Sequence, residues 1–105
     1  MAQFDVYKNK NPKSKSAYPY LVDVQSGLLS ELRTRVVVPA AKLTDLRKKP
    51  IKHLTPVVDI EGSKHLLLIP QLAGISIDEL GRAIGEVRSY RPEIVAAIDF
   101  LVVGV

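Results

Sequence analysis

The end of the chain, residues 89–105, constrains the fold most, because it reads as one helix with apolar side chains on nearly every side. The stripe that would face a core holds Ile94, Ile98, Leu101, Val102 and Val105. The opposite side, where polar residues are expected, holds Val95, Ala96, Phe100 and Val103, with Glu93 and Asp99 between them. The segment is too short to cross a bilayer, which needs roughly 20 apolar residues. Either it is a deeply buried core helix, or a second copy or a partner covers the side that its own sheet leaves free.

The bulk properties predict a single small domain over residues 1–105. A chain of 105 residues has the length of one domain, and its 47% hydrophobic and 25% charged residues argue against disorder. The absence of cysteine excludes disulfides and thiolate metal sites. The N-terminus resembles no secretory signal and no run reaches transmembrane length, so we expect a cytoplasmic protein without membrane contact.

Short apolar runs bounded by turn residues predict strands through most of the chain. The expected strands cover residues 3–7, 18–24, 34–39, 57–60, 64–69 and 75–77, with a hairpin turn at 61–63. Residues 40–49 predict a short helix or a turn, whereas Gly81 and Gly85 weaken any helix over 78–87. Ser89 is expected to cap the final helix, with Pro92 in its first turn. This order predicts a mainly β fold, an antiparallel sheet or small barrel, with one C-terminal α-helix.

Positive charge is concentrated in two stretches of the sequence. The first holds Lys8, Lys10, Lys13 and Lys15, and the second holds Lys42, Arg47, Lys48, Lys49 and Lys52 against Asp45. The rest of the chain has more acidic than basic residues. The two stretches are either solvated loops or a surface for an acidic partner. No aromatic residue interrupts the second stretch, so a nucleic-acid platform is not favoured.

Residues suited to catalysis are few. The candidates are two histidines and two neighbouring acids, His53, His65, Asp59 and Glu61. None of them forms a known metal-binding or catalytic motif, and such residues are usually structural or solvated. Arg33 and Arg35 flank Thr34 and could support phosphate chemistry, although arginines at strand ends usually lie on the surface. We therefore expect no catalytic residue, no metal site and no cofactor, and binding rather than catalysis.

Several segments together resemble the CcdB family. They are Gln-Phe-Asp-Val-Tyr at 3–7, Leu-Val-Asp-Val-Gln-Ser at 21–26, Arg-Val-Val-Val-Pro-Ala at 35–40, Thr-Pro-Val-Val-Asp-Ile at 55–60, and the end of the chain from residue 97. The resemblance covers essentially the whole chain, in order and at the length of the family. The block at 21–26 and the terminus with its glycine and aliphatic residues are the most specific parts.

The resemblance implies a fold and a function. The fold would be an SH3-like small barrel of the CcdB/MazF toxin type, assembled as a homodimer. The protein would be the toxin of a type II toxin–antitoxin module, which binds the DNA gyrase A subunit and traps the cleaved DNA–gyrase complex, blocking replication. It would be a gyrase poison rather than an enzyme. An acidic antitoxin similar to CcdA would neutralise it and repress the operon together with it, so that the toxin meets operator DNA only through that complex.

The resemblance also implies binding residues. The gyrase contacts would be Leu28, Leu29, Asp99, Val102, Val103, Gly104 and Val105. The chain departs from the family at Val103, where an aromatic residue is known, and at Asp99, where asparagine is common. Leu28 and Leu29 could instead be core residues under a loop, and Gly104 an ordinary glycine at a helix end. The antitoxin would contact Lys8, Lys10, Lys13, Lys15, Lys42 and Arg47.

Two other functions compete with gyrase poisoning. MazF-like endoribonuclease toxins share the barrel, and Arg33, Thr34 and Arg35 would then be the candidates for phosphate chemistry. The chain could also be a non-toxic dimeric binding module that has lost gyrase binding together with the aromatic residue.

Overall fold

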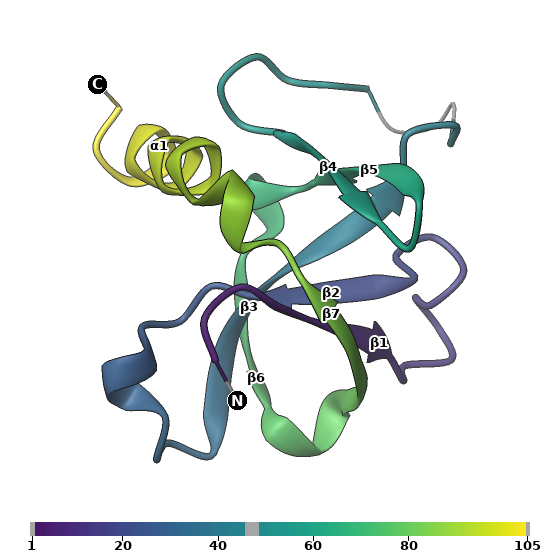
Figure 1. Ribbon diagram of the computed structural model, residues 1–105, viewed down its shortest axis with the longest axis vertical. Helices are drawn as coiled ribbons and strands as arrows, with labels where there is room; N and C mark the ends of the chain where they lie inside the picture. The colour runs from purple at the N-terminus through teal and green to yellow at the C-terminus, as the bar shows by residue number, and fades with distance from the viewer. Residues whose placement is uncertain (1, 46–48, 105) are drawn as a thin grey trace.

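The computed structural model describes residues 2–45 and 49–104 and shows a strongly bent sheet with a helix at the end of the chain (Figure 1). The strands are β1 (Asp5–Asn9), β2 (Tyr20–Asp23), β3 (Thr34–Lys42), β4 (Val57–Ile60), β5 (Ser63–Leu67), β6 (Ala73–Ser76) and β7 (Leu80–Glu86). The helical elements are α1 (Arg91–Val102) and the short 3-10 turns η1 (Gly27–Leu29), η2 (Ile69–Gln71), η3 (Ile77–Glu79) and η4 (Arg88–Tyr90). The predicted mainly β fold with one C-terminal helix is confirmed.

The long strand β3 organises the sheet, whose order is β4-β5-β3-β2-β1-β7, with β6 also paired to β3. All the pairings are antiparallel, and β5 and β6 pair with different parts of β3. The register places Val6 opposite Val22, and Val22 opposite Val38, so three buried valines form one row across the sheet. The sheet bends around this row and forms a half-barrel, and the three valines belong to the core that it encloses.

The core lies between the concave face of the sheet and α1. Its buried members are Phe4, Val6, Val22, Val24, Val38, Ala40, Val58, Ile60, Leu67, Ile69, Val87, Ile94 and Ala97. The other face of β3 is also covered, because Val37 packs with Tyr7 and Leu80 in a second cluster. Burial on both faces explains why the sequence of β3 is a run of valines rather than an alternation, and it confirms the predicted burial of this strand.

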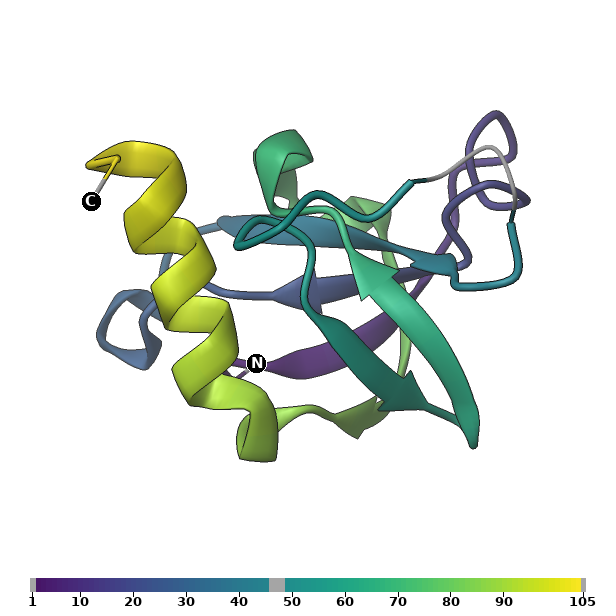
Figure 2. The same cartoon turned by 90° about the horizontal axis from the view of Figure 1, so that it is seen from above.

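The helix α1 differs from its prediction at both ends. Ser89 lies in η4 and does not cap α1; the N-cap is Tyr90, with no side-chain capping bond, while Pro92 lies in the first turn as predicted. The predicted core-facing stripe is right for Ile94, which is fully buried, and in part for Ile98. It is wrong for Leu101 and Val102, which are 39% and 74% exposed. The reason is geometric, because the last turns of α1 extend past the edge of the sheet (Figure 2).

Three loop and strand expectations can be compared directly with the structure. The predicted turn at 61–63 is confirmed: Glu61 and Gly62 join β4 to β5 with φ values of 53° and 78°, as a type I′ hairpin requires. Over 40–45 the chain continues β3 to Lys42 and then turns, so no helix forms there; residues 46–48 lie outside the described part. Residues 80–86 form strand β7 against β1, and Gly81 is needed there, because an added Cβ would lie 2.7 Å from the carbonyl oxygen of Lys8.

Within residues 2–45 and 49–104, no helix is long and apolar enough to cross a membrane. The same residues contain no group of three or more histidine, aspartate or glutamate side chains that could hold a metal ion.

Candidate functional site

The end of α1 presents apolar side chains to solvent. Val102 is 74% exposed and Val103 is 67% exposed, and Phe100 and Leu101 on the preceding turn are each more than one-third exposed. Asp99 is exposed beside them and its carbonyl accepts a hydrogen bond from the Val103 N–H over 2.8 Å. Contiguous apolar surface of this kind on a small protein typically marks an interaction site.

Gly104 closes the helix in the left-handed conformation. Its φ is +82°, and its N–H donates to the carbonyl of Phe100 over 3.0 Å, which is the hydrogen bond of an αL helix end. The conformation itself therefore favours glycine here. An added Cβ would meet no atom within 4 Å, so the backbone at Gly104 is also open to an approaching partner. Val105 lies outside the described residues.

The turn η1, between β2 and β3, presents a second apolar patch. Leu28 is 95% exposed and Leu29 is 50% exposed, so the alternative of two core leucines under a loop is wrong. Ser26 caps the turn, because its Oγ accepts a hydrogen bond from the Leu28 N–H over 3.2 Å. The two leucines are therefore held outward by local structure and not by contacts with a core.

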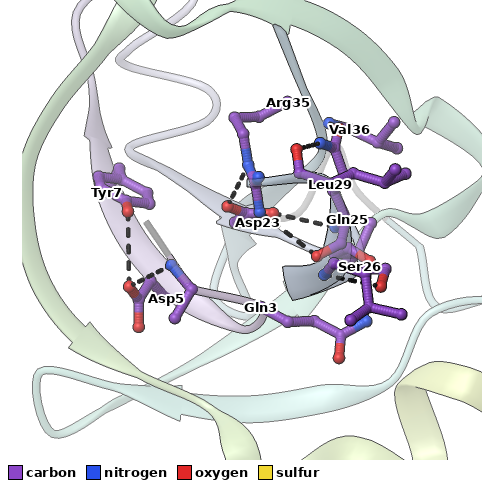
Figure 3. A network of polar contacts seen from close by, with 12 residues as sticks. Gln3, Asp5, Tyr7, Asp23, Gln25, Ser26, Leu29, Arg35 and Val36 are labelled. Atoms are coloured by element: carbon purple, nitrogen blue, oxygen red, sulfur yellow. Dashed lines mark hydrogen bonds and ion pairs between the residues drawn. The ribbon is translucent and has the colours of Figure 1, made fainter. Parts of the chain in front are cut away.

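A buried polar network lies directly beneath η1 (Figure 3). The Nε of Arg35 donates to Oδ2 of Asp23 over 2.7 Å, and both side chains are fully buried. The other carboxylate oxygen of Asp23 accepts from the backbone N–H of Gln25 over 2.9 Å. Arg35 was expected on the surface, and that expectation is wrong. The partner that allows burial, Asp23, is distant in sequence and is brought alongside by the β2–β3 pairing.

Gln25 links this network to the turn. Its Oε1 accepts from the Val36 N–H over 3.0 Å, and its Nε2 donates to the carbonyl of Leu29 over 3.0 Å (Figure 3). The side chain is buried, so neither bond competes freely with water. Gln25 was not among the predicted site residues. The available signal was its position between a predicted strand and a pair of leucines in a loop.

The two apolar patches are separate. Figures 1 and 2 place η1 and the end of α1 on the same side of the molecule, but Figure 1 separates them along the long axis. The predicted gyrase residues among 2–45 and 49–104 therefore form two patches on one side and not one continuous surface.

A groove of about 660 Å³ runs along α1 and was not predicted. One wall is α1, through Ala96, Ala97 and Phe100, and the other is the segment of residues 50–56. The ring of His53 packs against that of Phe100 in a tilted arrangement, with centroids 5.3 Å apart. No local signal marked this groove, because its walls lie far apart in sequence.

The first basic stretch lies on the opposite side of the molecule. Lys8, Lys10, Lys13 and Lys15 are exposed on β1 and the β1–β2 connection, and Lys42 is exposed at the end of β3. Both views place this connection and residues 43–45 together, away from the end of α1 (Figures 1 and 2). The second stretch is divided, because Lys52 lines the groove and Arg47 lies outside the described residues.

The candidates for catalysis do not converge. His65 is buried in β5, where its Nδ1 lies 2.9 Å from the carbonyl of Ser63 and its ring meets Tyr20 edge-on. Asp59 accepts a hydrogen bond from the hydroxyl of Tyr90 over 3.1 Å, and is thus tied to the start of α1. Glu61 sits in the hairpin turn.

The two arginines considered for phosphate chemistry lie in different surroundings. Arg33 is exposed and pairs loosely with Asp78 over 3.7 Å, whereas Arg35 is buried against Asp23. Thr34 is exposed between them. A phosphate at Thr34 could therefore reach Arg33 but not the fully buried Arg35.

Comparison with known proteins gives two findings. The sequence model of the family described as CcdB protein matches residues 3–104. Among solved structures, an endoribonuclease in complex with its cognate antitoxin, from a mycobacterial species, superposes with a TM-score of 0.77 at 15% sequence identity. The superposition covers 100% of this chain and 96% of the other. At that identity the likeness concerns the fold alone.

Proposed function

The chain belongs to the CcdB family, and from this we propose that it is the toxin of a type II toxin–antitoxin module, acting in the cytoplasm on the DNA gyrase A subunit. It binds gyrase while DNA is cleaved and holds the complex in that state, so that replication is blocked. The chain is a gyrase poison and not an enzyme, because its role is to bind a reaction intermediate of another protein.

One observation carries this proposal: the apolar end of α1, where Val102 and Val103 are 74% and 67% exposed. Burying such side chains on a partner is the main favourable term in protein association. Leu28 on η1 offers a second apolar contact on the same side. A partner that spans both patches gains more than either supplies alone.

The same reasoning gives the other partners. A second copy of the chain forms a homodimer that covers part of α1, whose exposed side includes Phe100 and Leu101. An acidic antitoxin binds the basic side that carries Lys8, Lys13 and Lys42, folds on it, and neutralises the toxin. The toxin and antitoxin together repress their operon, with DNA contacted through the antitoxin.

The decisive test is gyrase-dependent cleavage of supercoiled DNA. We expect the purified protein to accumulate linear DNA with gyrase, and a variant lacking residues 103–105 to lose this activity while keeping its circular dichroism. Leu43→Ala, which truncates an exposed leucine on the basic side, is the control and should behave as wild type. Unchanged activity of the truncated variant would refute the role of the helix end.

The endoribonuclease alternative is favoured by the fold likeness and opposed by the burial of Arg35. Incubation of the protein with RNA in the absence of gyrase distinguishes the two. We expect no cleavage; cleavage that Arg33→Ala abolishes would replace the gyrase proposal. Absence of both activities, with no growth arrest on expression, would favour the non-toxic binding module.

A further inference from the structure

We propose that Gln25 is a positioning residue for gyrase binding: its side-chain amide holds η1 in the conformation that presents Leu28. This inference rests on the proposed function, because it concerns one of the two patches that would contact gyrase. Gln25 is buried and would not itself contact gyrase, but it would set the position of Leu28, which would.

The two ends of the Gln25 amide have different tasks. The oxygen Oε1 accepts from Val36 N–H in β3, and the nitrogen Nε2 donates to Leu29 carbonyl in η1, each over 3.0 Å (Figure 3). One rigid planar group therefore joins the rigid centre of the sheet to the last residue of the turn. Only a side chain with both a donor and an acceptor can make this connection.

Gln25 is itself held in place by the buried ion pair. Asp23 accepts from the Gln25 backbone N–H over 2.9 Å, and Arg35 Nη2 donates to the Gln25 carbonyl over 3.4 Å. Because Asp23 and Arg35 are fully buried and paired at 2.7 Å, their positions are strongly fixed. The backbone at Gln25 is thus fixed from both sides before its side chain reaches the turn.

The turn needs such a tie because core packing does not hold it. Every residue from Ser26 to Thr34 is exposed, including Leu28 and Leu29. The further hydrogen bonds of the turn are local. They are the Ser26 cap, the backbone bond from Leu29 N–H to the Ser26 carbonyl over 3.0 Å, and the bond from Leu32 N–H to the Leu29 carbonyl over 3.2 Å. Without the tie from Gln25, the turn would fluctuate and would have to be ordered again on binding, which lowers affinity.

The test measures the affinity of dimeric toxin for purified gyrase A subunit. Gln25→Met keeps the length of the side chain but removes both hydrogen bonds, and Gln25→Glu keeps the acceptor but loses the donor to Leu29. We expect both to bind gyrase roughly tenfold more weakly, the factor for about 1.4 kcal/mol. Amide hydrogen exchange at residues 27–30 should accelerate, while exchange of the β3 amides is unchanged.

Asn9 provides a matched control. It is another buried amide that clamps a loop, with Nδ2 donating to Ser14 Oγ over 3.0 Å and to Tyr18 carbonyl over 2.9 Å. This loop lies on the basic side, so Asn9→Leu should loosen residues 11–18 and leave gyrase affinity unchanged.

A double-mutant cycle separates positioning from general damage. In a Leu28→Ala background the residue to be positioned is gone, so Gln25→Met should cost less than twofold in affinity. An equal loss in both backgrounds would overturn the inference, and so would wild-type affinity of Gln25→Met alongside weakened Leu28→Ala. If Gln25→Met fails to fold, Gln25→Glu carries the same cycle. If wild type itself does not bind gyrase, the proposed function fails, and the role of Gln25 in binding fails with it.

Discussion

At the scale of single residues, Asp23 and Arg35 are the positions where we expect one substitution to affect stability most. Their charges are buried together at 2.7 Å, and each also bonds to the backbone of Gln25. Removing one partner leaves the other as a buried charge without compensation, which costs far more than the pair contributes.

We expect Asp23→Asn to lower the free energy of unfolding by about 3–5 kcal/mol, because the Arg35 guanidinium would remain buried without a counter-charge. Urea unfolding followed by circular dichroism measures this. The double variant Asp23→Leu with Arg35→Met should recover most of the loss, since no charge is then buried. A double variant destabilised by the sum of the Asp23→Leu and Arg35→Met single variants would show that the two sites act independently.

Tyr7 gives a pH-dependent prediction. Burial, and then the nearby Asp5 carboxylate, raises the pKa of the Tyr7 hydroxyl above its usual value of about 10. The folded protein therefore holds this proton more tightly than the unfolded chain. The contribution to stability is complete below about pH 10 and is lost as pH rises from there through the folded-state pKa.

We expect the melting temperature of Tyr7→Phe to fall less than that of wild type between about pH 9 and about pH 11, because phenylalanine has no proton to lose. Thermal melts across this range measure the difference. Tyr20→Phe, at a half-buried tyrosine, is the control; the same flattening there would contradict the assignment to Tyr7.

At the scale of elements, most of the sheet could be predicted from the sequence, because local signals determine it. The valines of β3 required burial, and Glu61-Gly62 required a hairpin. What failed depended on contacts between distant segments. Strand pairing brings Asp23 to Arg35, and the sheet, rather than local propensity, makes 80–86 a strand.

The sequence pointed to the apolar residues of the candidate site, but not to their arrangement in space. The apolar excess of the last helix pointed to exposed side chains at its end, and Leu28 was unexplained as a loop residue. Their separation into two patches, the groove lined by residues 50–56, and the tie from Gln25 each depend on where the fold places segments that are distant in sequence.

The end of α1 yields a prediction about its last turn. Gly104→Ala places a Cβ at φ +82°, which costs about 1 kcal/mol locally, so the last turn should fray. We expect faster amide exchange at residues 102–104 and weaker gyrase binding. Unfolding in urea should hardly change, because these residues pack on nothing in the core. Gly85→Ala, at a glycine of β7 with no positive φ and open space around it, is the control. Unchanged exchange at residues 102–104 would show that this conformation does not hold the helix end.

At the scale of the whole molecule, the apolar patches and the first basic stretch lie on opposite sides. Gyrase would therefore be bound mainly through desolvation of apolar side chains. The antitoxin would be bound, on the opposite side, mainly through long-range electrostatic attraction.

We expect the triple variant Lys8→Glu, Lys13→Glu and Lys15→Glu to bind an acidic antitoxin peptide at least tenfold more weakly, with a shallower salt dependence, because the attraction is reversed. Gyrase affinity should stay at the wild-type value. Isothermal titration at two ionic strengths measures both. A parallel loss of gyrase binding would show that the two surfaces overlap.

The buried pair beneath η1 has a consequence for how such a chain can change over generations. Replacing Asp23 or Arg35 alone leaves a buried charge without a counter-charge. The base of the turn can therefore change only when both residues are substituted together. The side chains at the end of α1 face solvent and can be replaced one at a time. Adaptation to a different target is therefore easiest at the exposed side chains of the helix end, while the buried base of the turn changes only through paired substitutions.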